Sequence, residues 1–157
     1  MNKKIVFALS VAVVAIVAVG TVSAFDLSDL GSLFGGAPQD QIVTIDGENF
    51  TISGTFKENE NISDNGTVND YYLFKVSDYE KGYTNGTNFI NILITEYNTT
   101  EIGDDLVNFM NGTSKDINGV KGYLYSDDTG VTYTFAKDNK VISIQSDNEE
   151  LIAPVIA

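Results

Sequence analysis

Six asparagines in this chain are each followed, two positions later, by serine or threonine. N-x-S/T is the acceptor motif for N-linked glycans, so these side chains could carry sugar on an exported protein. The candidate glycosylation sites are Asn61, Asn65, Asn85, Asn98 and Asn111. Asn49 also fits the motif, but it lies at a predicted hairpin where folding would block it. The alternative is that a chain rich in Asn and Thr produces the motif by chance, since Asn-Gly pairs also mark turns.

Carboxylates form two further groups with the chemistry to bind a cation. Glu58, Glu60 and Asp64 are close together in one predicted loop, and Asp127 and Asp128 share another. Calcium takes six to eight oxygen ligands, and neither group has the spacing of a calcium-binding loop. No pair of carboxylates stands out for glycoside hydrolysis, which needs two at a set separation. The sequence therefore predicts no metal site and no cofactor, with a calcium site as an alternative.

The residue types that are absent restrict the chemistry further. The chain has no His, no Cys and no Arg. It therefore lacks an imidazole base for neutral pH, a thiolate nucleophile and a bidentate anion clamp. Zinc, copper and haem sites normally draw on His and Cys ligands. We expect a protein that is not an enzyme, and a small hydrolase is the less favoured alternative.

The charge balance restricts the partners. The chain has 9 Lys against 22 Asp and Glu, and without Lys3 and Lys4 the balance becomes 7 − 22 = −15. Such an acidic surface repels nucleic acid and anionic lipid, because both need basic groups to neutralise their phosphates. Eight tyrosines offer another surface for sugars or proteins, although Tyr also fills half-buried strand positions well. A surface module that binds a glycan or a cation is thus an alternative function.

The N-terminus predicts export. Lys3 and Lys4 precede an uncharged apolar run over residues 5–24, and the run ends in small residues at Val22-Ser23-Ala24. This is the three-part pattern of a secretory signal, but a run of about 20 apolar residues can also remain as a membrane anchor. Both interpretations place the following domain outside the cytoplasmic membrane, since the lysines stay inside. Residues 25–40 read as a flexible linker, and residues 41–157 as the extracytoplasmic domain.

Hydrophobic periodicity predicts an α+β domain. Asp46-Gly47 is a hairpin signal between two β-rich runs, and residues 57–66 lose periodicity and read as a loop. A helix is expected over residues 100–111, where apolar residues recur on one helical face, and a short one after residue 147, ended or kinked by Pro154. Further strands are expected at 70–76, 89–97, 114–117, 122–125, 131–136 and 141–145, with a turn at Asn118-Gly119 between the third and fourth of them. We therefore expect an antiparallel β-sheet with one or two helices packed on it.

Three short motifs resemble small exported proteins of methanogenic archaea. They are Ile52-x-Gly54-x-Phe56, with Ser53 where those proteins usually have proline; residues 118–123 (NGVKGY); and residues 140–144 (KVISI) with the ending at 150–152 (ELI). The resemblance covers roughly residues 42–156. It implies an archaeal cell-envelope setting, and it supplies no catalytic residues. The α+β layout also resembles the topology of the extrinsic photosystem subunit PsbP.

These observations together predict an exported cell-envelope protein with a structural or interaction role. It would be secreted, or held on the membrane by residues 5–24 and facing outward. Its partner would be an envelope component or another protein rather than a nucleic acid.

Overall fold

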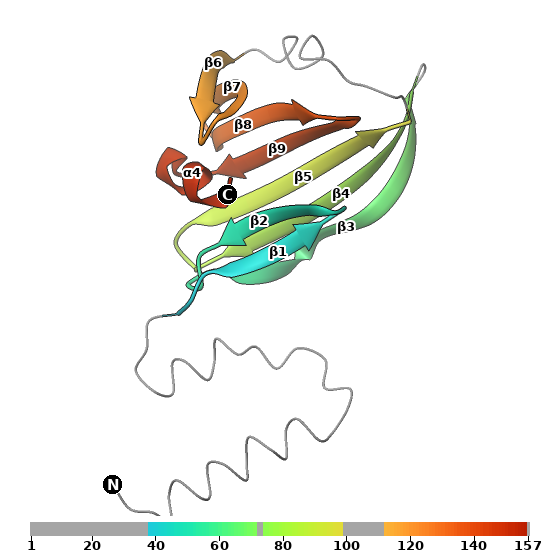
Figure 1. Cartoon of the computed structure of the whole chain (residues 1–157). Helices are drawn as coiled ribbons and strands as arrows, with labels where there is room; N and C mark the ends of the chain where they lie inside the picture. Colours follow the sequence, from blue (N-terminus) through green and yellow to red (C-terminus); the bar gives the residue numbers. More distant parts are fainter. Residues whose placement is uncertain (1–37, 72–73, 99–111, 157) are drawn as a thin grey trace, which may run out of the picture. The chain divides into compact units, whose positions relative to one another are not determined.

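Nine β-strands and a short C-terminal helical turn make up the described part of the chain (Figure 1). The computed structural model describes residues 38–71, 74–98 and 112–156, which lie within the compact unit Pro38–Ala157. The elements are β1 (Gln41–Ile45), β2 (Glu48–Ile52), β3 (Lys57–Tyr71), β4 (Phe74–Thr84), β5 (Phe89–Tyr97), β6 (Thr113–Ile117), β7 (Val120–Asp127), β8 (Gly130–Lys137), β9 (Lys140–Ser146), the 3-10 turn η1 (Glu149–Leu151) and α4 (Ile152–Val155).

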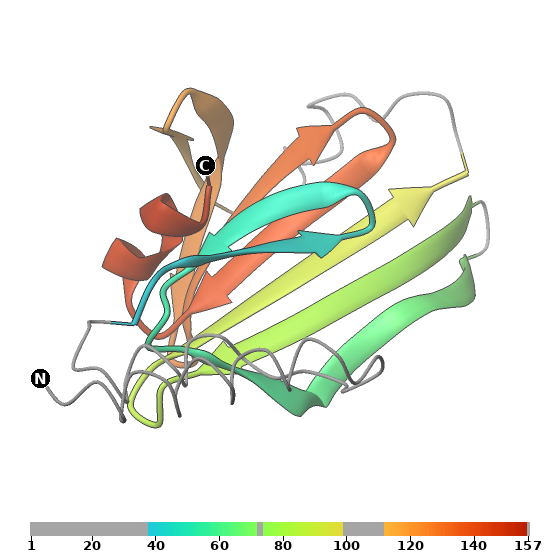
Figure 2. The same cartoon turned by 60° about the horizontal axis from the view of Figure 1, so that its bottom comes forward.

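Seven of these strands form one antiparallel sheet in the order β3-β4-β5-β9-β8-β7-β6. The remaining two strands, β1 and β2, pair with each other as a hairpin. The hairpin and α4 lie over the same face of the large sheet (Figures 1 and 2). The domain is thus a sheet with a small second layer on one face, and this second layer encloses the core.

The core follows from strand alternation at the centre of the sheet. Ile90, Ile92 and Ile94 of β5 are at most 2% exposed, because successive side chains on a strand point to opposite faces. They pair directly with buried positions of β9, including Ile92 with Ile144 and Ile94 with Ile142. The hairpin covers these isoleucines with Phe50 and Ile52, which belong to the same buried cluster.

The hairpin itself confirms the Asp46-Gly47 prediction. Asp46 has φ 45° and Gly47 has φ 79°, and positive φ at both central residues is the condition for the type I′ turn that suits paired strands. The register pairs Ile45 with Glu48 directly across this turn. The turn therefore fixes which side chains of β1 and β2 face the sheet.

The expected α+β class is wrong: 69% of the described residues are in strands, and the only helical residues among them are those of η1 and α4. The segment 57–66, predicted as a loop, belongs to the long strand β3. It gives no strand signal because β3 is an edge strand with polar side chains and two register shifts, a common protection against edge-to-edge pairing. The run 70–76, predicted as one strand, is divided between the end of β3 and the start of β4, where Asp70 pairs with Lys75.

The strands predicted after residue 112 are confirmed in order as β6 to β9, and the short C-terminal helix is confirmed as η1 and α4. The Asn148 side chain caps η1 by accepting a hydrogen bond from the backbone N–H of Glu150. Pro154 lies inside the single turn of α4, where a proline is tolerated because the first helical N–H groups have no partner within the helix.

The predicted helix at 100–111 and the N-terminal segment 1–24 lie outside the described residues. Among the residues that are described, no helix has the length and apolar character needed to cross a membrane.

Candidate functional site

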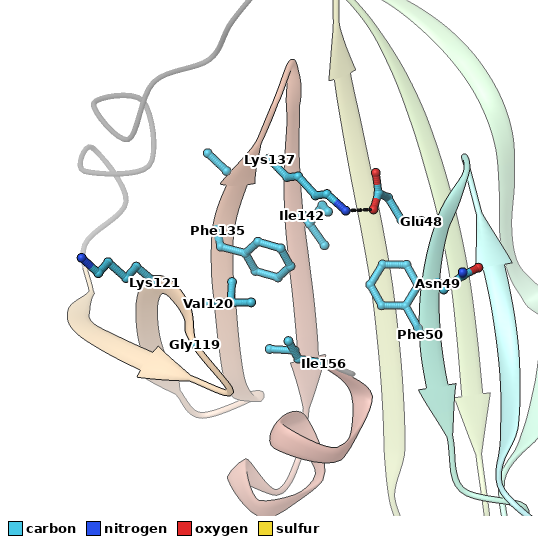
Figure 3. A pocket seen from close by; sticks show the side chains of 11 residues that line it. Glu48, Asn49, Phe50, Gly119, Val120, Lys121, Phe135, Lys137, Ile142 and Ile156 are labelled. Carbon is cyan, nitrogen blue, oxygen red and sulfur yellow. Dashed lines mark hydrogen bonds and ion pairs between the residues drawn. The ribbon is translucent and has the colours of Figure 1, made fainter.

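A groove of about 490 Å³ opens between the hairpin and the β6–β7 end of the sheet (Figure 3). Its walls and floor come from five separate places in the chain. They are Glu48, Asn49 and Phe50 of β2; Gly119, Val120 and Lys121 at the β6–β7 turn; Phe135, Ala136 and Lys137 of β8; Ile142 of β9; and Ile156 after α4. Concave apolar surfaces of this size are the usual form of binding sites.

The floor of the groove is apolar. Phe135 of β8 and Ile142 of β9 are paired neighbours in the sheet, so both side chains point to the face that carries the hairpin. Phe50 of β2 lies across from Phe135, and Figure 3 shows the two rings on opposite sides of the opening. A ligand here would contact aromatic and aliphatic carbon on both sides.

One end of the groove is closed by the C-terminal segment. Asn118 and Gly119 form the β6–β7 turn, with φ 55° and 83°. The Asn118 amide Nδ2 donates to the carbonyl oxygen of Ile156 at 2.7 Å and to that of Ala153 at 2.8 Å. The turn and the C-terminal residues are thereby held together, and Ile156 is placed at the end of the groove.

Two lysines form ion pairs with the hairpin at the opposite end of the groove. Lys137 Nζ lies 2.5 Å from Glu48 Oε2, so this ion pair joins β8 to the hairpin across the mouth of the groove (Figure 3). Lys140 Nζ lies 2.9 Å from Asp46 Oδ2 and 3.7 Å from Glu48 Oε1. Burial alone would lower the pKa of Lys140, but its hydrogen bond to Asp46 and the nearby carboxylates outweigh burial and raise that pKa. Lys140 is therefore a fixed positive charge under the hairpin turn.

The unpaired backbone edge of β2 also lies beside the groove. Within the described residues β2 pairs only with β1, so its second edge faces the opening. The two-residue turn makes Ile45 and Glu48 a hydrogen-bonded pair, and bonded and non-bonded pairs then alternate along the hairpin. The N–H and C=O groups of Asn49 and Thr51 consequently point away from β1. Of these two residues, Asn49 lines the groove, so its backbone groups are open to an added strand.

Most tyrosines serve the core rather than a surface. Tyr83 and Tyr133 are buried, and Tyr125 of β7 is the one exposed residue among the six tyrosines whose burial the structure describes. Burial, with a smaller contribution from the charge of Glu58, raises the pKa of Tyr83 to about 12. The Tyr133 hydroxyl lies 2.6 Å from the carbonyl oxygen of Val120 and donates to it, which ties β8 to the start of β7. These positions favour the half-buried interpretation of the tyrosine set.

The acidic groups from the sequence do not converge. Glu58 forms an ion pair with Lys81, and Asp64 accepts hydrogen bonds from the backbone and hydroxyl of Thr67. These bonds lower the pKa of Asp64, and bonds from Thr129 lower that of Asp127 in the same way. No three acidic side chains of the described residues gather into a group able to hold a metal ion.

The motif asparagines lie at the surface. Asn61, Asn65, Asn85 and Asn98 have exposed side chains, whereas Asn111 lies outside the described residues. Asn49 at the hairpin is exposed as well, so folding does not block its side chain, which projects from the outer face of β2.

Comparison with known proteins adds no relative to this picture. The chain matches no protein-family model, and neither curated proteins nor solved structures show a match. The resemblance to exported proteins of methanogens stays a prediction.

Sequence reasoning missed the groove. Its residues come from positions 48–50, 119–121, 135–137, 142 and 156, and no local pattern links segments so far apart. Two turn motifs in the sequence, Asp46-Gly47 and Asn118-Gly119, bear on the groove. The first turn precedes β2 and the second joins β6 to β7, and these elements lie on opposite sides of the groove.

Proposed function

We propose that this protein is an exported, non-enzymatic interaction protein of the cell envelope, and that its groove binds an extended segment of a partner protein. Export, by cleavage after residue 24 or by retention of residues 5–24 as an anchor, follows from the N-terminal sequence pattern. The observation that carries the binding proposal is the free backbone edge of β2 beside the apolar floor formed by Phe135 and Ile142.

An extended segment matches both features of the site. Added to the edge of β2, it would pair with the N–H and C=O groups of Asn49, while alternate side chains would enter the groove. A small apolar ligand would use the floor but would leave the strand edge unpaired. The edge therefore favours a polypeptide over a small molecule.

The charge of the groove favours an acidic segment. Residues 38–157 contain seven Lys and twenty Asp or Glu, yet the lining has two Lys, Lys121 and Lys137, and one carboxylate, Glu48. An incoming carboxylate would displace Glu48 from its ion pair with Lys137, whose side chain is about half exposed. The proposed partner segment thus alternates acidic and apolar residues.

The absence of an enzymatic role is supported by the residue types in the whole sequence. With no His and no Cys, the chain lacks the side chains most often used as general bases and thiolate nucleophiles near neutral pH.

A cross-linking experiment tests the binding proposal. The chain has no cysteine, so Lys121→Cys introduces a unique thiol in the groove lining that takes a photoactivatable maleimide and leaves Lys137 in place. After illumination with an envelope extract, we expect one partner, joined through an acidic and apolar segment that mass spectrometry of the linked peptide identifies. Asp128→Cys, on the exposed β7–β8 turn, is the control position and should not capture this segment.

Two proline variants test the strand edge directly. In the Lys121→Cys protein, Asn49→Pro removes an N–H from the free edge of β2, and we expect the cross-link to fall about tenfold. Thr44→Pro is the matched control, because Thr44 is the direct partner of Asn49 and its N–H points to the other edge of the hairpin. Equal cross-linking by both proline variants, or a linked segment without acidic residues, would contradict the proposal.

A further inference from the structure

The described asparagines can be divided by the N-x-S/T motif into two classes that differ in how consistently they are exposed. All five motif asparagines in the described residues are exposed: Asn49, Asn61, Asn65, Asn85 and Asn98. The seven described asparagines outside the motif are different: Asn59, Asn69, Asn88, Asn91 and Asn139 are half-buried, while Asn118 and Asn148 are exposed but hydrogen-bonded. Every described motif asparagine is thus exposed, against two of the seven outside the motif.

The two classes also differ at the atom that a glycan would modify. An N-linked sugar is attached to Nδ2 of the asparagine amide. Outside the motif, Nδ2 is often a structural donor, as in Asn69 to Asp78 at 2.7 Å and Asn88 to Asp147 at 2.9 Å. Among the described residues, no motif asparagine donates a hydrogen bond from Nδ2. Asn49 and Asn85 use only Oδ1, which accepts from Thr44 and from the backbone of Thr87 and Asn88.

The motif asparagines also occupy irregular or outward positions. Asn61 lies within the first register shift of the edge strand β3, and Asn65 is at the second. Asn98 follows the last residue of β5. A sugar at these positions would displace no core side chain.

Asn85 has the most open setting of the five. It lies in the turn between β4 and β5, and both Asn85 and Thr87 are exposed. Between them, Gly86 has φ 88°, and apart from its two chain neighbours no residue lies within 4 Å of the place where a Cβ would stand. A transferase therefore has access to the asparagine amide and to the hydroxyl residue of the motif.

We propose that the domain carries N-linked glycans at its exposed motif asparagines, with Asn85 as the principal site. This inference rests on the proposed export, because the sugar donor would be an oligosaccharide esterified to a membrane-lipid phosphate. In the transfer, Nδ2 forms a bond to the anomeric carbon of the sugar. The bond from that carbon to the phosphate oxygen breaks, the lipid phosphate leaves with the electron pair, and the amide loses one proton.

The positions of the sites fit the proposed binding role. Glycans on Asn61 and Asn65 would cover the unpaired edge of β3, which protects it from pairing with other chains. No motif asparagine follows Asn111, so β6 to β9 stay bare. The Asn49 side chain points away from the groove toward β1, where Thr44 donates to it at 2.8 Å (Figure 3). The groove would remain open.

The test is peptide mass mapping of the full protein purified from the cells that make it, together with fractionation of those cells. We expect the peptide that contains Asn85 to carry a discrete sugar mass. Thr87→Ala should abolish that mass, and Thr87→Ser, which keeps the motif, should retain it. Neither variant alters Asn85 itself.

The outcomes separate the two proposals. A protein found outside the cytoplasmic membrane with an unmodified Asn85 peptide overturns the glycan assignment and leaves export intact. A protein confined to the cytoplasm overturns export, and this inference with it. A sugar mass that persists in Thr87→Ala would place the glycan on another residue and would also overturn the assignment.

Discussion

Asn118 holds the C-terminus of the domain through Ile156. Its Nδ2 donates to the Ile156 carbonyl oxygen at 2.7 Å, although the two residues are 38 positions apart. The same nitrogen bonds the carbonyl of Ala153 at 2.8 Å, so one side chain satisfies two carbonyl groups around α4. This contact places Ile156 at the end of the groove. It links a turn that the sequence predicts to a groove that the sequence does not reveal.

Removal of the Asn118 amide should loosen the C-terminal segment. We expect Asn118→Gly, which keeps the positive φ accessible, to lower the free energy of unfolding by about 1–2 kcal/mol through the lost hydrogen bonds. Asn118→Ala should cost about 1 kcal/mol more, because alanine is strained at φ 55°. Urea unfolding measures both. Wild-type stability in Asn118→Gly would show that the contact does not hold α4.

The burial of Tyr83 should make stability fall at high pH. The unfolded pKa is about 10, whereas the folded pKa of Tyr83 is about 12. Because the folded state binds this proton more tightly, the contribution is complete below about pH 10 and is lost as pH rises toward 12, by roughly 2–3 kcal/mol in total. Urea unfolding between pH 8 and 11 should show the decline. It should be smaller in Tyr83→Phe and unchanged in Tyr125→Phe, where the ring is exposed.

The Lys140 ammonium should stabilise the hairpin through its carboxylate neighbours. Lys140 is 13% exposed and lies 2.9 Å from Asp46 Oδ2. We expect Lys140→Met to cost about 2 kcal/mol, because it leaves Asp46 and Glu48 without their shared cation. In a double-mutant cycle, Asp46→Asn should recover part of this loss, since asparagine also suits the positive φ of the turn. Strictly additive effects would argue against the coupling.

We expect Gly122 not to tolerate a side chain, because neighbouring atoms already fill the space that a Cβ would occupy. A Cβ at this position would lie 2.6 Å from the Thr134 carbonyl oxygen and 2.7 Å from Cζ of the Tyr133 ring. Both neighbours belong to the sheet, so we expect Gly122→Ala to lower the free energy of unfolding by about 1–3 kcal/mol. Lys121→Ala, on the preceding exposed residue, is the control and should change stability by less than about 0.5 kcal/mol. Similar unfolding curves for the two variants would refute this packing argument.

Local signals in the sequence predicted the parts of the fold in which each residue acts on its near neighbours. Asp46-Gly47 and Asn118-Gly119 predicted turns, because few other residue pairs accept positive φ at consecutive positions. The isoleucines of β5 predicted a strand because they alternate along it. The prediction failed for β3, where a polar edge strand has no buried face to impose a period.

The sequence by itself determined the residue inventory: an acidic chain without His, Cys or Arg, six N-x-S/T motifs, and an uncharged apolar run near the N-terminus. Only the tertiary structure decided which asparagines keep a free amide, and that Phe50, Phe135 and Ile156 line one groove. The reason is physical. Residue type and local pattern depend on covalent neighbours, whereas exposure and cavities depend on which distant strands pair, and that pairing is set by the whole core at once.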